Sequence, residues 1–85
     1  MPPTISQFYG IRLVMYLKNK EHNPPHIHAY YGDDEAKFLI SNGELYEGHF
    51  PKRGSSFVKE FIIKNQKELT IMWETEKYKK LPPIK

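Results

Sequence analysis

The chain has 85 residues, of which 13 are Lys or Arg, 10 are Asp or Glu, and none is Cys. This length suffices for one domain but not for two, and the absence of cysteine excludes disulfides and thiolate metal ligands. The start of the chain lacks a basic stretch followed by an apolar run, and no apolar run is long enough to span a membrane. We therefore expect a cytoplasmic protein.

Charge is distributed unevenly along the chain. Residues 1–50 contain four Lys or Arg against six Asp or Glu, whereas residues 51–85 contain nine against four. A basic half favours phosphate-rich partners. A lysine-coated helical face that keeps a small protein soluble would have the same composition, and the interspersed glutamates favour this second interpretation for most of these lysines.

The first half of the chain predicts strands joined by short turns. Branched and aromatic residues or strict alternation mark four of them. The predicted strands cover residues 11–17, 26–31, 35–40 and 45–50. Gly32-Asp33-Asp34 is typical of a turn, and Asn42-Gly43 is a strong hairpin signal. Because every connection after the first strand is too short for a crossover, we expect an antiparallel four-stranded meander.

The second half predicts helix, because its apolar residues recur at the three- and four-residue spacings of one buried helical face. These residues are Phe57, Val58, Phe61, Ile62, Leu69, Met72 and Trp73. Asn65-Gln66 interrupts the pattern, which predicts either two helices with a short turn or one helix with a polar step. Leu81-Pro82-Pro83 should stop the helix and leave a frayed tail at 81–85.

These elements together predict an α+β fold in one domain, residues 1–85. The antiparallel four-stranded meander sheet should occupy about residues 8–50. One or two C-terminal helices, at about residues 52–80, should pack on it.

The most chemically distinctive segment is the histidine-rich stretch from Glu21 to His28. Strand alternation puts His26 and His28 on one face, and the stiff prolines before them could bring His22 nearby. Three such imidazoles could bind zinc or a similar ion, with His22, His26 and His28 as ligands. His26 and His28 could instead act as acid and base on a phosphodiester, because histidine titrates near neutral pH. A structural role, such as bonding a loop carbonyl or stacking on a tyrosine, is the third alternative.

Pro51-Lys52-Arg53 leads into the predicted helix, and we name it the basic helix entrance. Proline suits a first helical position, although Ser55 or Ser56 could be the N-cap instead. Cations are unfavourable at this end of the helix dipole. Lys52 and Arg53 therefore indicate either phosphate binding or simple tolerance at an exposed site. Arg12, isolated in an apolar strand, is a further candidate for phosphate binding, because such a charge normally has a partner or a role.

Several of these segments also carry a family resemblance. The most specific is Pro24-Pro25-His26-Ile27-His28-Ala29. It is accompanied by Phe8-Tyr9-Gly10-Ile11, Met15-Tyr16, Tyr31-Gly32, Asn42-Gly43, Gly48, Pro51-Lys52-Arg53 and Trp73-Glu74. With these motifs the chain resembles the prokaryotic family known as domain of unknown function 4160. It departs from that family at Phe61, where we expect a tryptophan, and at Lys20-Glu21, where an acidic pair is common. The resemblance implies a small cytoplasmic protein, often encoded beside another short gene in arrangements that look like toxin–antitoxin modules.

Three functions remain open on this basis. The first is a component of a toxin–antitoxin-like module that binds or acts on RNA through one surface, formed by the histidine strand and the basic helix entrance. In its catalytic form, His26 or His28 would be the acid or base of a metal-independent cleavage, with Arg12, Lys52 and Arg53 on phosphate. The second is a non-enzymatic module that pairs with a partner protein, such as a cognate small protein encoded nearby, or with itself. The third is a His-based metal protein. The sequence leaves any cofactor unknown.

Overall fold

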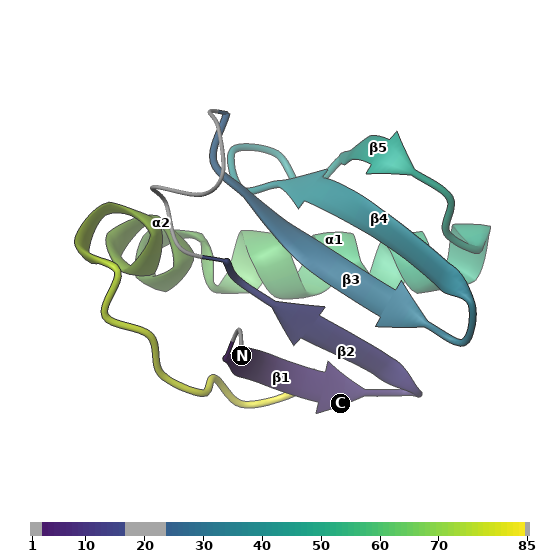
Figure 1. The fold of residues 1–85 in the computed structure, drawn as a ribbon, viewed down its shortest axis with the longest axis horizontal. Helices are drawn as coiled ribbons and strands as arrows, with labels where there is room; N and C mark the ends of the chain where they lie inside the picture. Colours follow the sequence, from purple (N-terminus) through teal and green to yellow (C-terminus); the bar gives the residue numbers. More distant parts are fainter. Residues whose placement is uncertain (1–2, 17–23, 85) are drawn as a thin grey trace.

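The computed structural model describes residues 3–16 and 24–84. Five strands form one antiparallel sheet in the order β1-β2-β3-β4-β5, and two helices follow (Figure 1). The elements are β1 Thr4–Phe8, β2 Ile11–Val14, β3 His26–Tyr31, β4 Asp34–Leu39, β5 Leu45–Gly48, α1 Lys52–Lys64 and α2 Gln66–Thr75. The expected α+β class is confirmed, but the sheet has five strands rather than four.

The additional strand is β1, which lies before the point where the sheet was expected to begin. A register shift between Thr4 and Ser6 places two consecutive buried residues, Ile5 and Ser6, in the strand and so breaks its alternation. A two-residue turn then joins β1 to β2 through Tyr9 and Gly10, whose φ angles are 51° and 79°. Such turns usually carry Asn-Gly or Gly-Gly. Because a tyrosine occupies the first position here, the sequence lacks the usual signal of this hairpin.

The two later hairpins differ in length. Tyr31 pairs with Asp34, so Gly32 and Asp33 form a two-residue turn between β3 and β4, close to the predicted one. Asn42-Gly43 instead belongs to a longer loop between β4 and β5. In that loop the Gly43 N–H donates to the Leu39 carbonyl oxygen at 2.8 Å. A Cβ at Gly43 would lie 3.1 Å from the Cα of Lys59, so glycine here lets the loop close on α1.

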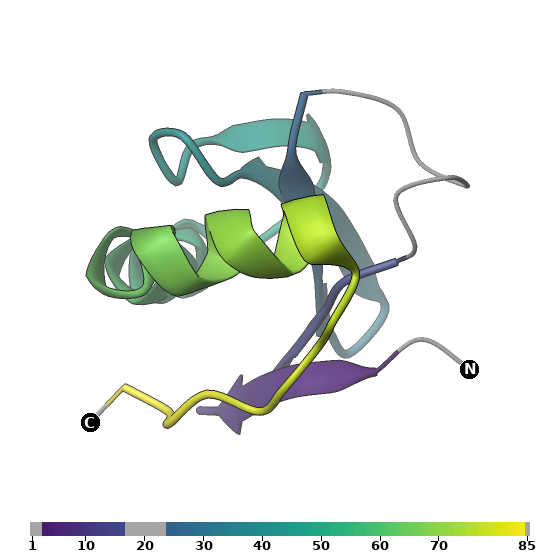
Figure 2. The same ribbon diagram turned by 90° about the vertical axis from the view of Figure 1, so that its left-hand side faces the viewer.

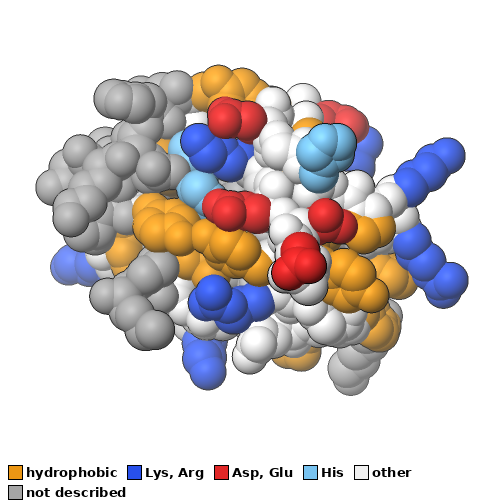
Figure 3. All heavy atoms as spheres, turned by 45° about the vertical axis from the view of Figure 1, so that its right-hand side comes forward, with side chains coloured by type: hydrophobic (Ala, Val, Ile, Leu, Met, Phe, Trp, Pro, Cys, Tyr) orange, Lys and Arg blue, Asp and Glu red, His pale blue; other side chains and the backbone are white. Residues whose placement is uncertain are grey.

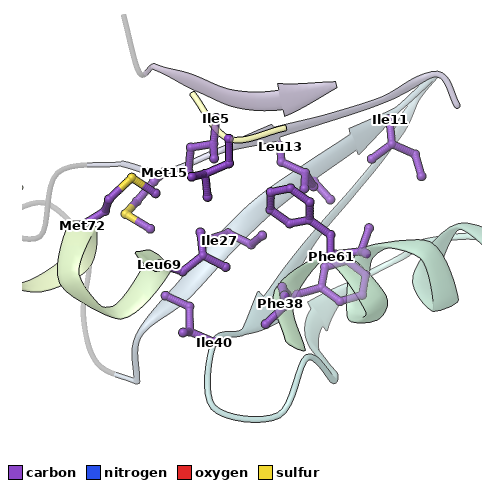
Figure 4. Close-up of a cluster of buried hydrophobic side chains, with 14 of the residues drawn as sticks. Ile5, Ile11, Leu13, Met15, Ile27, Phe38, Ile40, Phe61, Leu69 and Met72 are labelled. Atoms are coloured by element: carbon purple, nitrogen blue, oxygen red, sulfur yellow. The ribbon is translucent and has the colours of Figure 1, made fainter. Parts of the chain in front are cut away.

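Both helices cover one face of the sheet (Figures 1 and 2). α1 ends at Lys64, and Asn65 is its C-cap. The Asn65 N–H donates to the Phe61 and Ile62 carbonyl oxygens, and its side-chain Nδ2 also donates to the Phe61 carbonyl oxygen. The two-helix alternative is therefore the correct one. The helices contribute Val58, Phe61, Ile62, Leu69, Met72 and Trp73 to the core (Figure 4). Phe57 is only partly buried against that core. Neither helix is long and apolar enough to cross a membrane, within the residues that the structure describes.

The segment after α2 packs against the sheet. α2 ends at Thr75, earlier than expected, because Glu76 adopts a left-handed conformation with φ 60°. The chain then runs alongside β1 (Figure 2), where the Leu81 N–H donates to the Ile5 carbonyl oxygen at 2.8 Å. Leu81 and Ile84 are only 8% and 5% exposed. The expectation of a frayed tail therefore does not match residues 81–84, whose apolar side chains find a place in the core.

Candidate functional site on the outer face of the sheet

Strand alternation divides the sheet into a core-facing side and an outer face. Ile11, Leu13, Ile27, Ala29, Ala36 and Phe38 belong to the core, so the residues between them in each strand point away from the helices. Arg12 pairs with Tyr30, and Tyr30 pairs with Glu35, which makes one cross-strand row on that outer face. In the next row His28 lies between Val14 and Lys37. The outer face therefore brings Arg12 and His28 together, as two of the site residues expected from the sequence.

His26 and His28 lie on the same face of β3, immediately after Pro24-Pro25, as predicted. Their ring centroids are 5.2 Å apart. They are only 3% and 6% exposed, which is much more buried than a surface histidine motif would be. His26 lies with its ring 5.2 Å from that of Trp73 in α2, and its Nδ1 donates to the Pro24 carbonyl oxygen at 2.8 Å.

His28 is surrounded by groups that can orient it. Its ring meets Tyr16 edge-on with centroids 4.4 Å apart and stacks on Tyr30 at 6.5 Å. The Glu35 Oε2 atom lies 3.7 Å from the His28 Nδ1 atom, within ion-pair distance of a protonated imidazole. Glu35 is exposed while His28 is buried, so the carboxylate reaches the imidazole from the solvent side.

Two tyrosine hydroxyls connect this histidine to Arg12. The Tyr16 and Tyr30 hydroxyl oxygens lie 2.5 Å apart and share a hydrogen bond. Burial, followed by this bond, raises the pKa of Tyr30 far above its usual value. The Arg12 guanidinium lies over the Tyr30 ring, 5.0 Å from its centroid, and donates to the Thr4 hydroxyl at 3.3 Å. No described carboxylate pairs with Arg12, so its charge stays available to an anion.

The charges on this side of the molecule are mixed. Lys37 pairs with Glu47 across β4 and β5 at 3.6 Å. Figure 3 shows acidic and basic side chains intermingled there with hydrophobic ones. Among the residues that the structure describes, this face therefore carries one cation without a carboxylate partner, Arg12, beside His28, Tyr30 and Glu35. It does not form a broad basic field of the kind that binds duplex nucleic acid.

The basic helix entrance lies elsewhere. Pro51 is the N-cap of α1, with no side-chain cap and no acidic residue in the first turn, so neither Ser55 nor Ser56 caps the helix. Lys52 and Arg53 are exposed, and the Arg53 guanidinium lies 5.8 Å from the centroid of the Phe57 ring. This position is on the helix side of the sheet and at the end of β3 opposite His26. The expected single surface of histidine strand and basic helix entrance is therefore not formed, because a sheet separates the two.

The metal alternative depends on a residue outside the described ones. Within residues 3–16 and 24–84, no group of three or more His, Asp or Glu side chains could hold a metal ion. His22, the third ligand of the predicted set, lies outside these ranges. His26 and His28 alone offer two ligands, whereas zinc sites in proteins usually have three or four protein ligands.

Glu35 is the site residue that sequence inspection missed. An exposed glutamate on a strand resembles ordinary surface charge, yet the hairpin carries a signal that would have found it. If Gly32 and Asp33 form a two-residue turn, then Tyr30 must pair with Glu35 and His28 with Lys37. The pairing places the carboxylate on the histidine face.

Comparisons with known proteins match most of the chain to one family and assign no activity. No curated protein and no solved structure matches the chain. One family model does match, over residues 10–74, which include all of β2, β3, β4, β5 and α1 and almost all of α2. The residues expected to bind phosphate and the two histidines fall inside the match. The chain therefore belongs to the family described as domain of unknown function (DUF4160).

Proposed function

We propose that the outer face of the sheet binds RNA, with Arg12 on a phosphate and His28 beside it as an acid–base group. The protein would do so as a component of a toxin–antitoxin-like module. The observation that supports this most is the cluster of Arg12, Tyr30, Glu35 and His28 on neighbouring strands, in which Arg12 lacks a carboxylate partner among the described residues. Arginine suits this role because its planar fork of donors matches phosphate oxygens.

The catalytic form of the proposal is metal-independent cleavage of a phosphodiester. A base takes the proton from a ribose hydroxyl, whose oxygen attacks phosphorus. The bond to the neighbouring ribose oxygen breaks, and an acid returns a proton to that oxygen. Two imidazoles 5.2 Å apart have the chemistry for these two steps. The Glu35 carboxylate, 3.7 Å from the His28 Nδ1 atom, would hold the His28 ring in position for this step. Lys52 and Arg53 have no part in this step, because they lie across the sheet.

The decisive measurement is binding of a mixed RNA pool at low and moderate salt. We expect the parent to bind with strong salt dependence, Arg12→Gln to weaken binding, and Glu35→Gln to retain affinity while slowing any cleavage. His26→Ala with His28→Ala should remove cleavage, and a melting curve shows whether this buried pair still folds. A parent that shows no salt-sensitive binding, or an Arg12→Gln variant that binds as tightly, contradicts the proposal.

One observation favours the interaction module as a second candidate. β5 is a short edge strand whose four residues are all exposed, and Leu45 and Tyr46 on it are 39% and 49% exposed. Such an edge can accept a strand from a partner. Stable co-elution with the protein encoded beside it, lost in a Tyr46→Glu variant and unaffected by Arg12→Gln, would support this candidate over RNA binding.

A further inference from the structure

An aromatic hollow lies at the junction of the β1–β2 turn, the end of β3 and the start of α1. Its volume is about 120 Å³, and it is lined by Tyr9, Tyr31, Phe57 and Arg53, together with Ile11 and Gly54. Tyr9 and Tyr31 are 53% and 44% exposed, so two of its three aromatic residues are accessible to solvent. We name this site the aromatic hollow.

Tyr9 occupies a backbone conformation that tyrosine rarely adopts. Its φ of 51° lies in the left-handed region, where Gly, Asn and Asp are favoured and other side chains are strained. The turn brings the Tyr9 ring to 4.6 Å from that of Phe57, yet half of the side chain stays exposed. Burial therefore explains only in part why a tyrosine occupies this position. A residue that departs from the backbone preference of its site often has a role beyond folding.

The charge at the hollow is positive. The Arg53 guanidinium lies over the Phe57 ring, pairs with no described carboxylate, and has no acidic neighbour in the first turn of α1. Aromatic rings beside an arginine can bind a planar group that carries negative charge. A nucleotide has both properties, because its base can stack and its phosphate can accept from the guanidinium.

The hollow and the outer face meet through consecutive residues. Ile11 and Tyr31 line the hollow, while their chain neighbours Arg12 and Tyr30 form the outer-face row. The two sites therefore lie on opposite faces of the sheet at the same end of β2 and β3, and one single strand of RNA would pass around that end to reach both. We infer that the aromatic hollow holds an unstacked base of single-stranded RNA, with the adjoining phosphate at Arg53, on the same strand that Arg12 contacts. This inference rests on the proposed RNA binding and adds a preference for single strands.

The test compares Tyr9→Asn with Ile71→Asn, using a labelled single-stranded RNA octamer and the duplex of the same sequence. Asparagine tolerates the left-handed backbone, so Tyr9→Asn removes the ring without adding backbone strain, and a melting curve shows whether the lost contact with Phe57 costs stability. Ile71 is a similarly exposed apolar residue on α2, away from the hollow. We expect Tyr9→Asn to weaken single-strand binding by about fivefold or more, Arg53→Gln to weaken it as well, and Ile71→Asn to bind like the parent. The duplex should bind more weakly than the single strand.

The outcomes separate this inference from the proposed function. If Arg12→Gln weakens binding while Tyr9→Asn binds like the parent, RNA still uses the outer face and the aromatic hollow is not a base site. If Tyr9→Asn weakens binding while Arg12→Gln does not, the hollow holds the base and the outer-face proposal fails. A parent that binds neither RNA overturns both.

Discussion

The Nδ1 atom of His26 lies 2.8 Å from the carbonyl oxygen of Pro24, two residues earlier in the chain. A carbonyl oxygen can only accept, so Nδ1 must carry the proton and Nε2 holds the lone pair of the neutral ring. The two prolines restrict the backbone that presents this carbonyl. The lead-in to β3 therefore selects one tautomer of His26.

We predict that nitrogen NMR, at a pH where the His26 ring is neutral, shows its single proton on Nδ1. Pro24→Gly should give a mixture of the two tautomers. Glycine removes the backbone restriction, so the carbonyl at position 24 would no longer be held against the His26 Nδ1 atom. The spectrum of the parent alone can contradict this: a His26 protonated at Nε2 would mean that the Pro24 contact is not a hydrogen bond.

Ile62 and Ile63 form a matched pair for testing the helical side of the core. Ile62 is fully buried and Ile63 is 50% exposed, although both lie in α1. We expect Ile62→Ala to cost about 2–5 kcal/mol of unfolding free energy and Ile63→Ala to change it by less than about 0.5 kcal/mol. Urea unfolding followed by circular dichroism measures both. Equal losses would mean that α1 does not pack through this face.

The sequence predicted the parts of the fold that depend on local patterns. β3, the Gly32-Asp33 turn and the polar break at Asn65 follow from alternation, turn chemistry and helical period. β1 does not, because its bulge breaks the alternation and Tyr9 conceals its turn. The packing of Leu81 could not be predicted either. The two prolines after it signal the end of a helix and carry no information about its contact with Ile5, 76 residues earlier in the sequence.

In the candidate site too, features of a single strand could be predicted, whereas features that depend on tertiary packing could not. The shared face of His26 and His28 is a property of one strand and could be predicted. The separation of Lys52 and Arg53 from them could not, because it depends on which face of the sheet α1 covers. The burial of His26 and His28 could not be predicted either, because the rings that they contact, Trp73 and Tyr16, lie outside β3 in the sequence.

Tyr30 should make stability fall at alkaline pH. Its pKa is raised in the folded protein, first by burial and then by the Tyr16 hydrogen bond. As pH rises through about 10, the usual value, the unfolded chain loses this proton before the folded protein does, so unfolding becomes easier. The contribution is fully present below that pH and is lost above it. Urea unfolding between about pH 8 and about pH 11 should show this fall, with a shallower slope in Tyr30→Phe. Identical slopes would rule Tyr30 out as its source.

The segment after α2 should contribute to stability through Leu81. Its side chain is 8% exposed and its N–H bonds to Ile5 of β1. We expect Leu81→Ala to cost about 2 kcal/mol, near the low end for a buried leucine because the site lies at the margin of the core. The exposed neighbour Lys80 provides the control, and Lys80→Ala should be nearly neutral. Thermal melting compares the two, and a neutral Leu81→Ala would show that the segment frays in solution.

The last prediction separates phosphate contacts from stacking by their salt dependence. Each phosphate contact on a single strand contributes about 0.7 to the slope of the logarithm of affinity against the logarithm of salt concentration. Arg12→Gln should therefore reduce that slope by about 0.7, whereas Tyr9→Asn should lower affinity at every salt concentration and leave the slope unchanged.

Lys64→Gln is the matched control, because it removes the same charge from the far end of α1. It should leave both affinity and slope close to those of the parent. If Lys64→Gln changes the slope as much as Arg12→Gln does, RNA responds to the net charge of +3 rather than to a defined contact. The outer face would then not be a specific phosphate-binding site. The interaction module, with its exposed β5 edge, would become the better explanation of the function.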